Sequence, residues 1–182
     1  TVIAIHGKEN VDATEMGRMV AIEKPTKLPG PGESALLLGK ESEKWRNNEL
    51  EAFTSTPVYR AGRVYSTIKT GELLCVNADS GSVIWRLKLA PDQVHASPTW
   101  ADGKLFVPMF DGKVFVVKDK GTEGEILDEV QLDGACLAAP SVSHGRVFVQ
   151  SKKRLYCFGS KKPAADFTPR ANSAAKGFGQ PV

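Results

Sequence analysis

Cysteines and long hydrophobic runs are both scarce in this 182-residue chain. Its three cysteines, Cys75, Cys136 and Cys157, form no C-x-x-C pair and leave at least one thiol unpaired, which argues against a zinc site or a disulfide framework. No apolar run approaches the roughly 20 residues of a membrane-spanning helix. The N-terminus, TVIAIHGKEN, lacks the layout of a signal peptide and resembles the middle of a strand, so we expect the chain to be a piece of a longer protein.

Charge of one sign is also in short supply, since the formal net charge is only +3. Much of the basic excess lies in SKKR and in the segment beginning SKKPAAD, with no aromatic side chains interleaved. This distribution favours a solvated surface and predicts no nucleic-acid partner. A hydrophobic content of 41% is ordinary for one globular domain.

What the chain does contain is an internal repeat. STPVYRAGRVYSTIKTGELLCV is followed by ASPTWADGKLFVPMFDGKVFVV and then by AAPSVSHGRVFVQSKKRLYCF. Pro57, Pro98 and Pro140 are 41 and 42 residues apart, and the glycines at 62, 103 and 145 keep the same spacing. A period near 40 made only of short strands and turns is typical of β-propeller blades, which are four-stranded sheets stacked on their neighbours.

The first full repeat predicts four strands: STPVY innermost, RVYSTI second, ELLCVNA third and SVIWRLKL outermost. The run LLCV has no polar residue, so both faces of the third strand should be covered by neighbouring blades. Asn77 and Asp79 suit the turn that follows, because their side chains can bond nearby backbone amides. We expect Trp85 to pack between blades.

The expected fold is all-β: a partial β-propeller with antiparallel four-stranded blades, forming an open arc of about three to four blades at the C-terminal end of a larger propeller. Residues 1–159 form the propeller part, and 160–182 are expected to be a disordered tail or linker. The segment EKPTKLPGPGESALLLGKES is an inserted loop in which ALLL is a candidate short strand. The blades are predicted as a partial blade 1–50, blades 51–92 and 93–134, and an incomplete blade 135–159.

The segment Cys75–Trp85 resembles the repeat of the pyrroloquinoline-quinone (PQQ) propeller family, Ala-x-Asp-x-x-Thr-Gly-x-x-x-Trp, including its BamB-like bacterial members. Cys75 stands at the alanine, Asn77 at the aspartate and Ser80 at the threonine, while Gly81 and Trp85 match. The next repeat, KDKGTEGEILDEV, lacks the Thr-Gly pair and the tryptophan. The resemblance implies an exported protein of the periplasm or cell envelope.

The family contains functions of different classes. Its quinoprotein dehydrogenases hold PQQ over calcium and often carry adjacent cysteines, and this chain has neither adjacent cysteines nor a carboxylate that maps to a calcium ligand. The sequence therefore favours a non-catalytic scaffold or binding module with a protein partner. The alternatives are part of a PQQ- and calcium-dependent alcohol or sugar dehydrogenase whose site lies on other blades, and a sensor propeller fused to a catalytic domain. No metal or catalytic residue is predicted, no cofactor is evident, and peripheral membrane association would have to come from regions outside the chain.

A binding surface is expected where two kinds of loop share one face of the propeller, around the mouth of the channel. Aromatic residues at such loop tips are favoured in interfaces. Simple packing is the competing interpretation: Phe53 and Leu137 would plug the channel, Met109 and Phe110 would close a blade interface, and His95 would cap a strand. The predicted binding residues are His6, Phe53, Lys69, His95, Phe110, Leu137 and Lys152.

Overall fold

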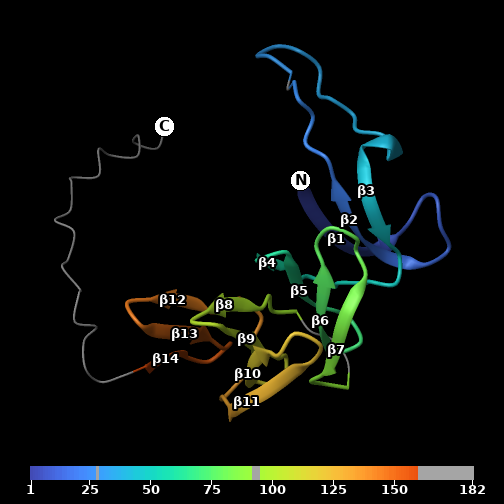
Figure 1. Cartoon of the computed structure of the whole chain (residues 1–182). Coiled ribbons are helices and arrows are strands. Elements are labelled where there is room, and N and C mark those ends of the chain that lie inside the picture. Colours follow the sequence, from blue (N-terminus) through green and yellow to red (C-terminus); the bar gives the residue numbers. More distant parts are fainter. Residues whose placement is uncertain (28, 92–94, 160–182) are drawn as a thin grey trace, which may run out of the picture.

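The computed structural model describes residues 1–27, 29–91 and 95–159, and it is built from four separate antiparallel sheets (Figure 1). In each sheet the strands follow chain order, and neighbouring strands are joined by short connections except β2 and β3, which residues 23–42 separate. The only helix in the described part is the short 3-10 helix η1 (Lys40–Ser42). The all-β prediction is therefore confirmed. The predicted tail, 160–182, lies outside the described residues.

The two central sheets have four strands and the two outer ones have three. The first sheet contains β1 (Val2–Glu9), β2 (Met16–Ile22) and β3 (Glu43–Asn47), and the second contains β4 (Val58–Arg60), β5 (Arg63–Thr67), β6 (Glu72–Asn77) and β7 (Val83–Lys88). The third sheet contains β8 (Thr99–Ala101), β9 (Lys104–Pro108), β10 (Lys113–Asp119) and β11 (Gly124–Gln131), and the fourth contains β12 (Ser141–Ser143), β13 (Arg146–Gln150) and β14 (Leu155–Gly159). Residues 35–38, the candidate strand ALLL, form no strand.

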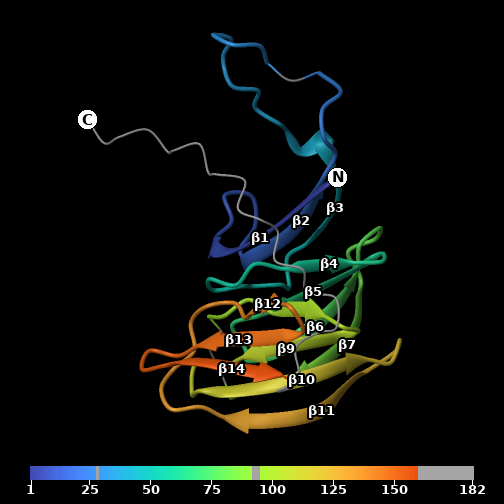
Figure 2. The same ribbon diagram turned by 90° about the vertical axis from the view of Figure 1, so that its left-hand side faces the viewer.

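The sheets follow one another along an open arc, with the short strands β4, β8 and β12 on its concave side (Figures 1 and 2). The repeated glycines form the tight turns between these strands and the next. Ala61 and Gly62 both have positive φ (48° and 78°), as the two central residues of a two-residue hairpin turn require. The pairs at 102–103 and 144–145 repeat this geometry, so the 41-residue period corresponds to a repeated hairpin.

Strand β6 shows why the sequence LLCV is apolar throughout. Leu73 and Cys75 pack on the third sheet, in a cluster with Leu105 and Val117. Leu74 and Val76 point the other way, into a cluster with residues of the first sheet. Successive side chains of a strand point to opposite faces, so a sheet between two others must be apolar on both. The prediction that both faces are covered is confirmed.

Tryptophans on the outermost strands join the first sheet to the second and the second sheet to the third. The Trp45 indole N–H donates to the carbonyl of Ala78 at 2.8 Å, and its ring lies against Gly81, in the turn of the second sheet. Trp85 repeats this at the following junction, where its ring lies against Gly124 and its N–H donates to Asp119 at 3.1 Å. Trp85 therefore packs between sheets, as predicted.

The cysteine prediction is only partly correct. Cys75 and Cys157 occupy equivalent positions, opposite Tyr65 on β5 and Phe148 on β13, and both are free. Cys75 is buried, but Cys157 is exposed, so the expectation that both are buried is wrong. Strand β14 is an edge of the fourth sheet, and no described strand pairs with its outer side. The same sequence position is therefore buried in an inner sheet and exposed in an outer one.

Candidate binding surface on the loop face

Two kinds of connection meet on one face of the arc: the hairpin turns between second and third strands, and the longer loops that lead into each next sheet. Backbone hydrogen bonds tie them together in the same way at two junctions. The N–H of Lys69 donates to the carbonyl of Glu51, and the N–H of Lys152 donates to that of Ala135, both at 2.8 Å. These loops are therefore fixed to each other by the backbone.

Four predicted residues form one continuous cluster across these loops. The rings of Phe53 and His95 are perpendicular, with centroids 4.7 Å apart. His95 in turn lies 5.2 Å from the ring of Phe110, and the ammonium of Lys152 lies 5.7 Å from the centroid of that ring. We call Phe53, His95, Phe110 and Lys152 the loop-face cluster. It connects the loops of the second, third and fourth sheets.

Hydrogen bonds from neighbouring loops hold His95 in this cluster. The Thr54 hydroxyl donates to the carbonyl of His95 at 2.9 Å and lies 3.3 Å from its ring Nδ1. On the next residue, the Ala96 carbonyl accepts a hydrogen bond from the Thr67 hydroxyl at 3.1 Å. The histidine is therefore placed by contacts with the second sheet as well as by its own loop.

The cluster is open to solvent at both aromatic ends. Phe53 is 51% exposed and Phe110 is 41% exposed, whereas the adjacent Met109 is buried in the core between the second and third sheets. The packing interpretation therefore describes Met109 but not Phe110. Because phenylalanine side chains are usually shielded from water, this exposure makes the cluster suitable for contact with another molecule.

The remaining three predicted residues lie outside the cluster as defined. Leu137 lines a shallow pocket of about 130 Å³ together with Lys152, so it borders the cluster. Lys69 is engaged in an ion pair with Glu51 at 3.1 Å. His6 lies on β1 of the first sheet, opposite Arg18. The structure thus brings together four of the seven residues and places a fifth beside them.

A buried polar site that sequence reasoning missed lies at the junction of the second and third sheets. The carboxylate of Asp119 accepts hydrogen bonds from the Tyr65 hydroxyl (2.6 Å), the Trp85 indole (3.1 Å) and the Gly121 backbone N–H (2.8 Å), and pairs with Arg63 at 3.0 Å. Burial alone would raise the pKa of Asp119, but these hydrogen bonds and the Arg63 charge outweigh it and hold the pKa below its usual range. The carboxylate is therefore fully engaged by these four groups, and it links the second sheet to the third.

The turn motif around Asn77 also occurs around Asp119, but its glycine comes one residue later. Asn77 accepts hydrogen bonds from the two backbone N–H groups that follow, at Asp79 and Ser80. Asp119 bonds Gly121 in the same manner, and Gly124 takes the place of Gly81 against a tryptophan. The turn from Asp119 to Gly124 is one residue longer than the turn from Asn77 to Gly81. That extra residue hides the motif in the sequence.

In the described part of the chain, no three His, Cys, Asp or Glu side chains are grouped as a metal site would require. None of its helices has the length and apolar character needed to cross a membrane.

A family model and a solved structure both support the fold. The family model for the outer membrane protein assembly factor BamB (PQQ_2) matches residues 35–124, about half of the chain. Among solved structures, BamB from Moraxella catarrhalis superposes with a TM-score of 0.60 at 15% identity, over 86% of this chain and 46% of that one. The chain thus spans just under half the length of that BamB. No curated protein sequence matches it.

Two further solved structures are similar to parts of the chain. The computationally designed Ika4 protein matches with a TM-score of 0.55 at 13% identity, over 64% of this chain and 72% of that one. A quinohemoprotein alcohol dehydrogenase from Pseudomonas putida matches over 53% of this chain and 16% of that one, with a TM-score of 0.47 and 20% identity. With its 41-residue repeat, its stacked meander sheets and the match to the BamB model, the chain belongs to the PQQ-like β-propeller repeat family.

Proposed function

We propose that the chain is a non-catalytic binding module, and that it holds a protein partner on the loop-face cluster. The observation that carries this proposal is the unbroken contact from Phe53 through His95 and Phe110 to Lys152, exposed on loops of three sheets. Exposed aromatic side chains supply large contact areas at low entropic cost, and hot spots in protein interfaces are enriched in such groups.

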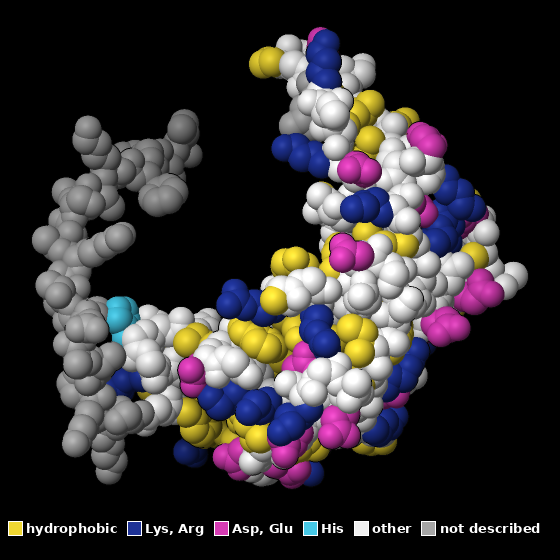
Figure 3. Space-filling model, in the orientation of Figure 1, with side chains coloured by type: hydrophobic (Ala, Val, Ile, Leu, Met, Phe, Trp, Pro, Cys, Tyr) yellow, Lys and Arg dark blue, Asp and Glu magenta, His cyan; other side chains and the backbone are white. Residues whose placement is uncertain are grey.

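One face of the arc is mixed in charge rather than basic. On the face seen in the space-filling view, Lys and Arg side chains are interspersed with Asp and Glu (Figure 3). Nucleic-acid sites present a continuous basic stripe, and the face seen in Figure 3 has none, which supports a protein partner. The BamB-like family supports a location in the periplasm or cell envelope for that complex. We further propose that residues 1–159 act as one propeller unit.

Site-specific photo-crosslinking tests the proposal. A photoreactive phenylalanine analogue replaces Phe110 in one protein and Val130, on the outermost strand β11, in a matched control. We expect envelope proteins of the source organism to yield one specific adduct from position 110 and not from 130. The partner identified in this way should bind the Phe53→Ala/Phe110→Ala variant at least about tenfold more weakly. Equal binding by that variant would remove the cluster from the interface.

A separate titration distinguishes this function from the dehydrogenase alternative. Purified protein is mixed with PQQ and calcium, and the absorbance of bound quinone is followed. A binding module gives no saturable change, whereas a quinoprotein gives one at equimolar PQQ. The two experiments together separate a partner-binding propeller from a catalytic one.

A further inference from the structure

His95 lies at the centre of the loop-face cluster, and its contacts with Thr54 fix which of its ring nitrogens carries the proton. The Thr54 hydroxyl has one hydrogen, which it donates to the His95 carbonyl at 2.9 Å. The hydroxyl oxygen also lies 3.3 Å from Nδ1 of the His95 ring, and with its hydrogen already used it can only accept there. Nδ1 therefore carries the proton of the neutral ring, and Nε2 is left as a hydrogen-bond acceptor.

Nε2 of His95 has no hydrogen-bond partner in the described part of the chain. The atom is not fully buried, because within residues 1–27, 29–91 and 95–159 the one buried side-chain atom without a partner is Oδ1 of Asn10. The loop that carries His95 is held to the neighbouring loop, since the hydroxyl of Ser97 accepts the backbone N–H of Thr56 at 2.7 Å. The cluster therefore presents a fixed acceptor that another molecule can reach.

Two exposed phenyl rings flank the imidazole that carries this acceptor. The ring of Phe53 is perpendicular to that of His95, with centroids 4.7 Å apart, and the ring of Phe110 is tilted by 48° at 5.2 Å. Both phenylalanines are more than one-third exposed. A donor that reaches Nε2 therefore lies close to phenyl rings, and such rings favour an aromatic side chain as the carrier of the donor.

Lys152 disfavours a cationic donor and favours an indole. Its ammonium lies 5.7 Å from the centroid of the Phe110 ring. A Lys or Arg side chain of a partner would meet this like charge, which costs free energy. Among the neutral aromatic side chains that carry a donor, tryptophan binds a cation most strongly, and its N–H donates without bringing an acceptor. The charge of Lys152 and the acceptor on His95 therefore favour the same side chain.

The chain's own tryptophans bind in this way at two junctions between sheets. The indole N–H of Trp45 donates to the Ala78 carbonyl at 2.8 Å, and that of Trp85 donates to the carboxylate of Asp119 at 3.1 Å. In both cases the ring lies against the neighbouring sheet while the N–H reaches a fixed acceptor. His95 offers such an acceptor on the outside of the molecule.

We infer that the loop-face cluster binds a tryptophan side chain of the protein partner. The indole N–H donates to Nε2 of His95, and the ring packs against Phe53 and Phe110. This inference rests on the proposed function, because it names the side chain that the partner places on the same cluster. His95 is then the residue that determines specificity, since it distinguishes tryptophan from phenylalanine, which has a ring but no donor.

The position of the proton on His95 can be measured without any ligand. Nitrogen-15 NMR of the full 182-residue chain at about pH 8, where an ordinary imidazole is neutral, should show the far-downfield signal of an unprotonated nitrogen at Nε2. Thr54→Val removes the hydroxyl and should move protonation toward Nε2. Thr122→Val, at an exposed threonine in the turn before β11, is the matched control and should leave the signals unchanged. A proton on Nε2 in the native chain would overturn the inference.

Short peptides test the binding of tryptophan itself. Acetyl-GSWSG-amide is titrated into the full chain beside two matched peptides, in which phenylalanine or 1-methyltryptophan replaces the tryptophan. We expect the tryptophan peptide to bind about three- to tenfold more tightly than either, because each of the others lacks the donor, and to shift the NMR signals of His95 and Phe110. His95→Phe keeps an aromatic ring without the acceptor and should abolish this preference.

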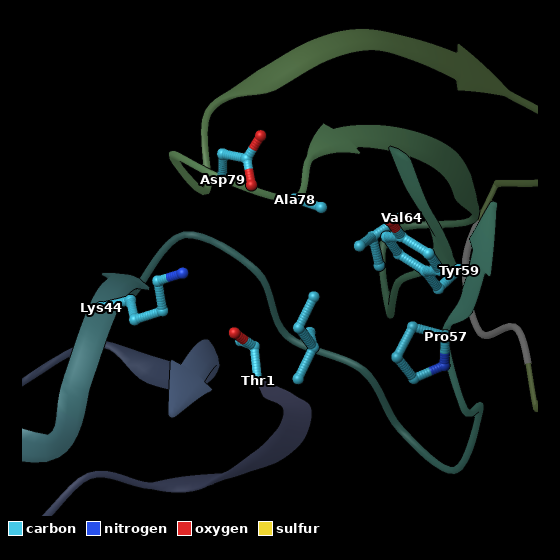
Figure 4. A pocket seen from close by; sticks show the side chains of 8 residues that line it. Thr1, Lys44, Pro57, Tyr59, Val64, Ala78 and Asp79 are labelled. Carbon is cyan, nitrogen blue, oxygen red and sulfur yellow. The ribbon is translucent and has the colours of Figure 1, made fainter. Parts of the chain in front are cut away.

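Equal affinity for the three peptides, or no binding of any of them, would overturn the inference. Shifts confined to the cleft of about 490 Å³ between the first and second sheets, which Tyr59 and Ala78 help to line, would also overturn it (Figure 4). None of these results bears on the proposed function, which the crosslink from position 110 decides. A partner that crosslinks there without presenting a tryptophan would leave the proposed function intact and remove this inference.

Discussion

At the residue scale, single glycines decide how closely each tryptophan approaches the next sheet. A Cβ atom built on Gly81 would lie 2.4 Å from Cε3 of Trp45, and one built on Gly124 would lie 2.9 Å from Cζ3 of Trp85. Both are too short for real carbon contacts. Glycine is therefore needed at both positions for space, and at Gly81 also for its positive φ of 75°.

Gly81→Ala should destabilise the protein more than Gly62→Ala does. Both glycines have similar positive φ (75° and 78°), so both substitutions carry the same backbone strain of about 1 kcal/mol. Only Gly81 has a ring against it, whereas nothing lies within 4 Å of a Cβ at Gly62. Overpacking should add about 1 to 3 kcal/mol at Gly81, measured by urea denaturation. Equal losses would show that Trp45 moves aside freely.

Trp85→Ala should cost about 3 to 5 kcal/mol of unfolding free energy, because it leaves a cavity between two sheets and removes a partner of Asp119. Trp100→Ala should cost less, about 1 to 2 kcal/mol, since Trp100 is half-buried and loses mainly its stacking on Tyr65. Thermal and denaturant melts of the two variants provide the comparison. Small and equal effects would contradict the interlocking of the sheets.

The pKa of Asp119 predicts a specific response to acid. Because its folded-state pKa is lowered, the carboxylate contributes stability above its unfolded pKa of about 3.9, and that contribution is lost as the pH falls through the folded value. Stability should therefore fall below about pH 4. Asp119→Asn should lose about 1 to 3 kcal/mol at pH 7 and show a smaller further loss between pH 5 and pH 3. An unchanged acid response in that variant would assign the effect to other carboxylates.

At the element scale, the edge strand β14 differs from the inner strand β6 in what covers it. Native protein should therefore react with a thiol reagent rapidly at Cys157 and slowly at Cys75 and Cys136. Burial also raises the pKa of both buried thiols, which lowers their thiolate fraction. Peptide mapping after brief labelling should find the reagent at Cys157, and all three sites should react in denaturant. Fast labelling of Cys75 would contradict its place between sheets.

Elements with a regular spacing were predictable from the sequence, and contacts between repeats were not. The spacing of about 41 residues predicted the repeated hairpin turns such as the one at Gly62. The apolar run LLCV predicted a strand that is covered on both faces. The contact between His95 and Phe110 has no such signal, because it joins loops whose separation depends on how two sheets stack. The exposure of Cys157 also depends on the position of its sheet in the arc, which local sequence does not encode.

At the scale of the whole molecule, the fourth sheet leaves apolar side chains uncovered. Leu155 is 69% exposed, and Val142 and Phe158 are also exposed. Uncovered apolar surface and open strand edges favour association. We expect the 182-residue chain to be marginally stable and to associate as its concentration rises, as measured by light scattering and thermal melts. Leu155→Lys should reduce this association, and a monodisperse, cooperatively melting native chain would contradict it.

The tryptophan anchors have a consequence for how such proteins change in length. Trp45 joins the first sheet to the turn of the second at Gly81, and Trp85 joins the second sheet to the turn of the third at Gly124. The second sheet has both halves of the contact, since Gly81 receives the ring of the sheet before it and Trp85 contacts the sheet after it. Genes of this kind can gain or lose a unit in one event without a compensating mutation, so blade number is expected to vary more readily than blade structure.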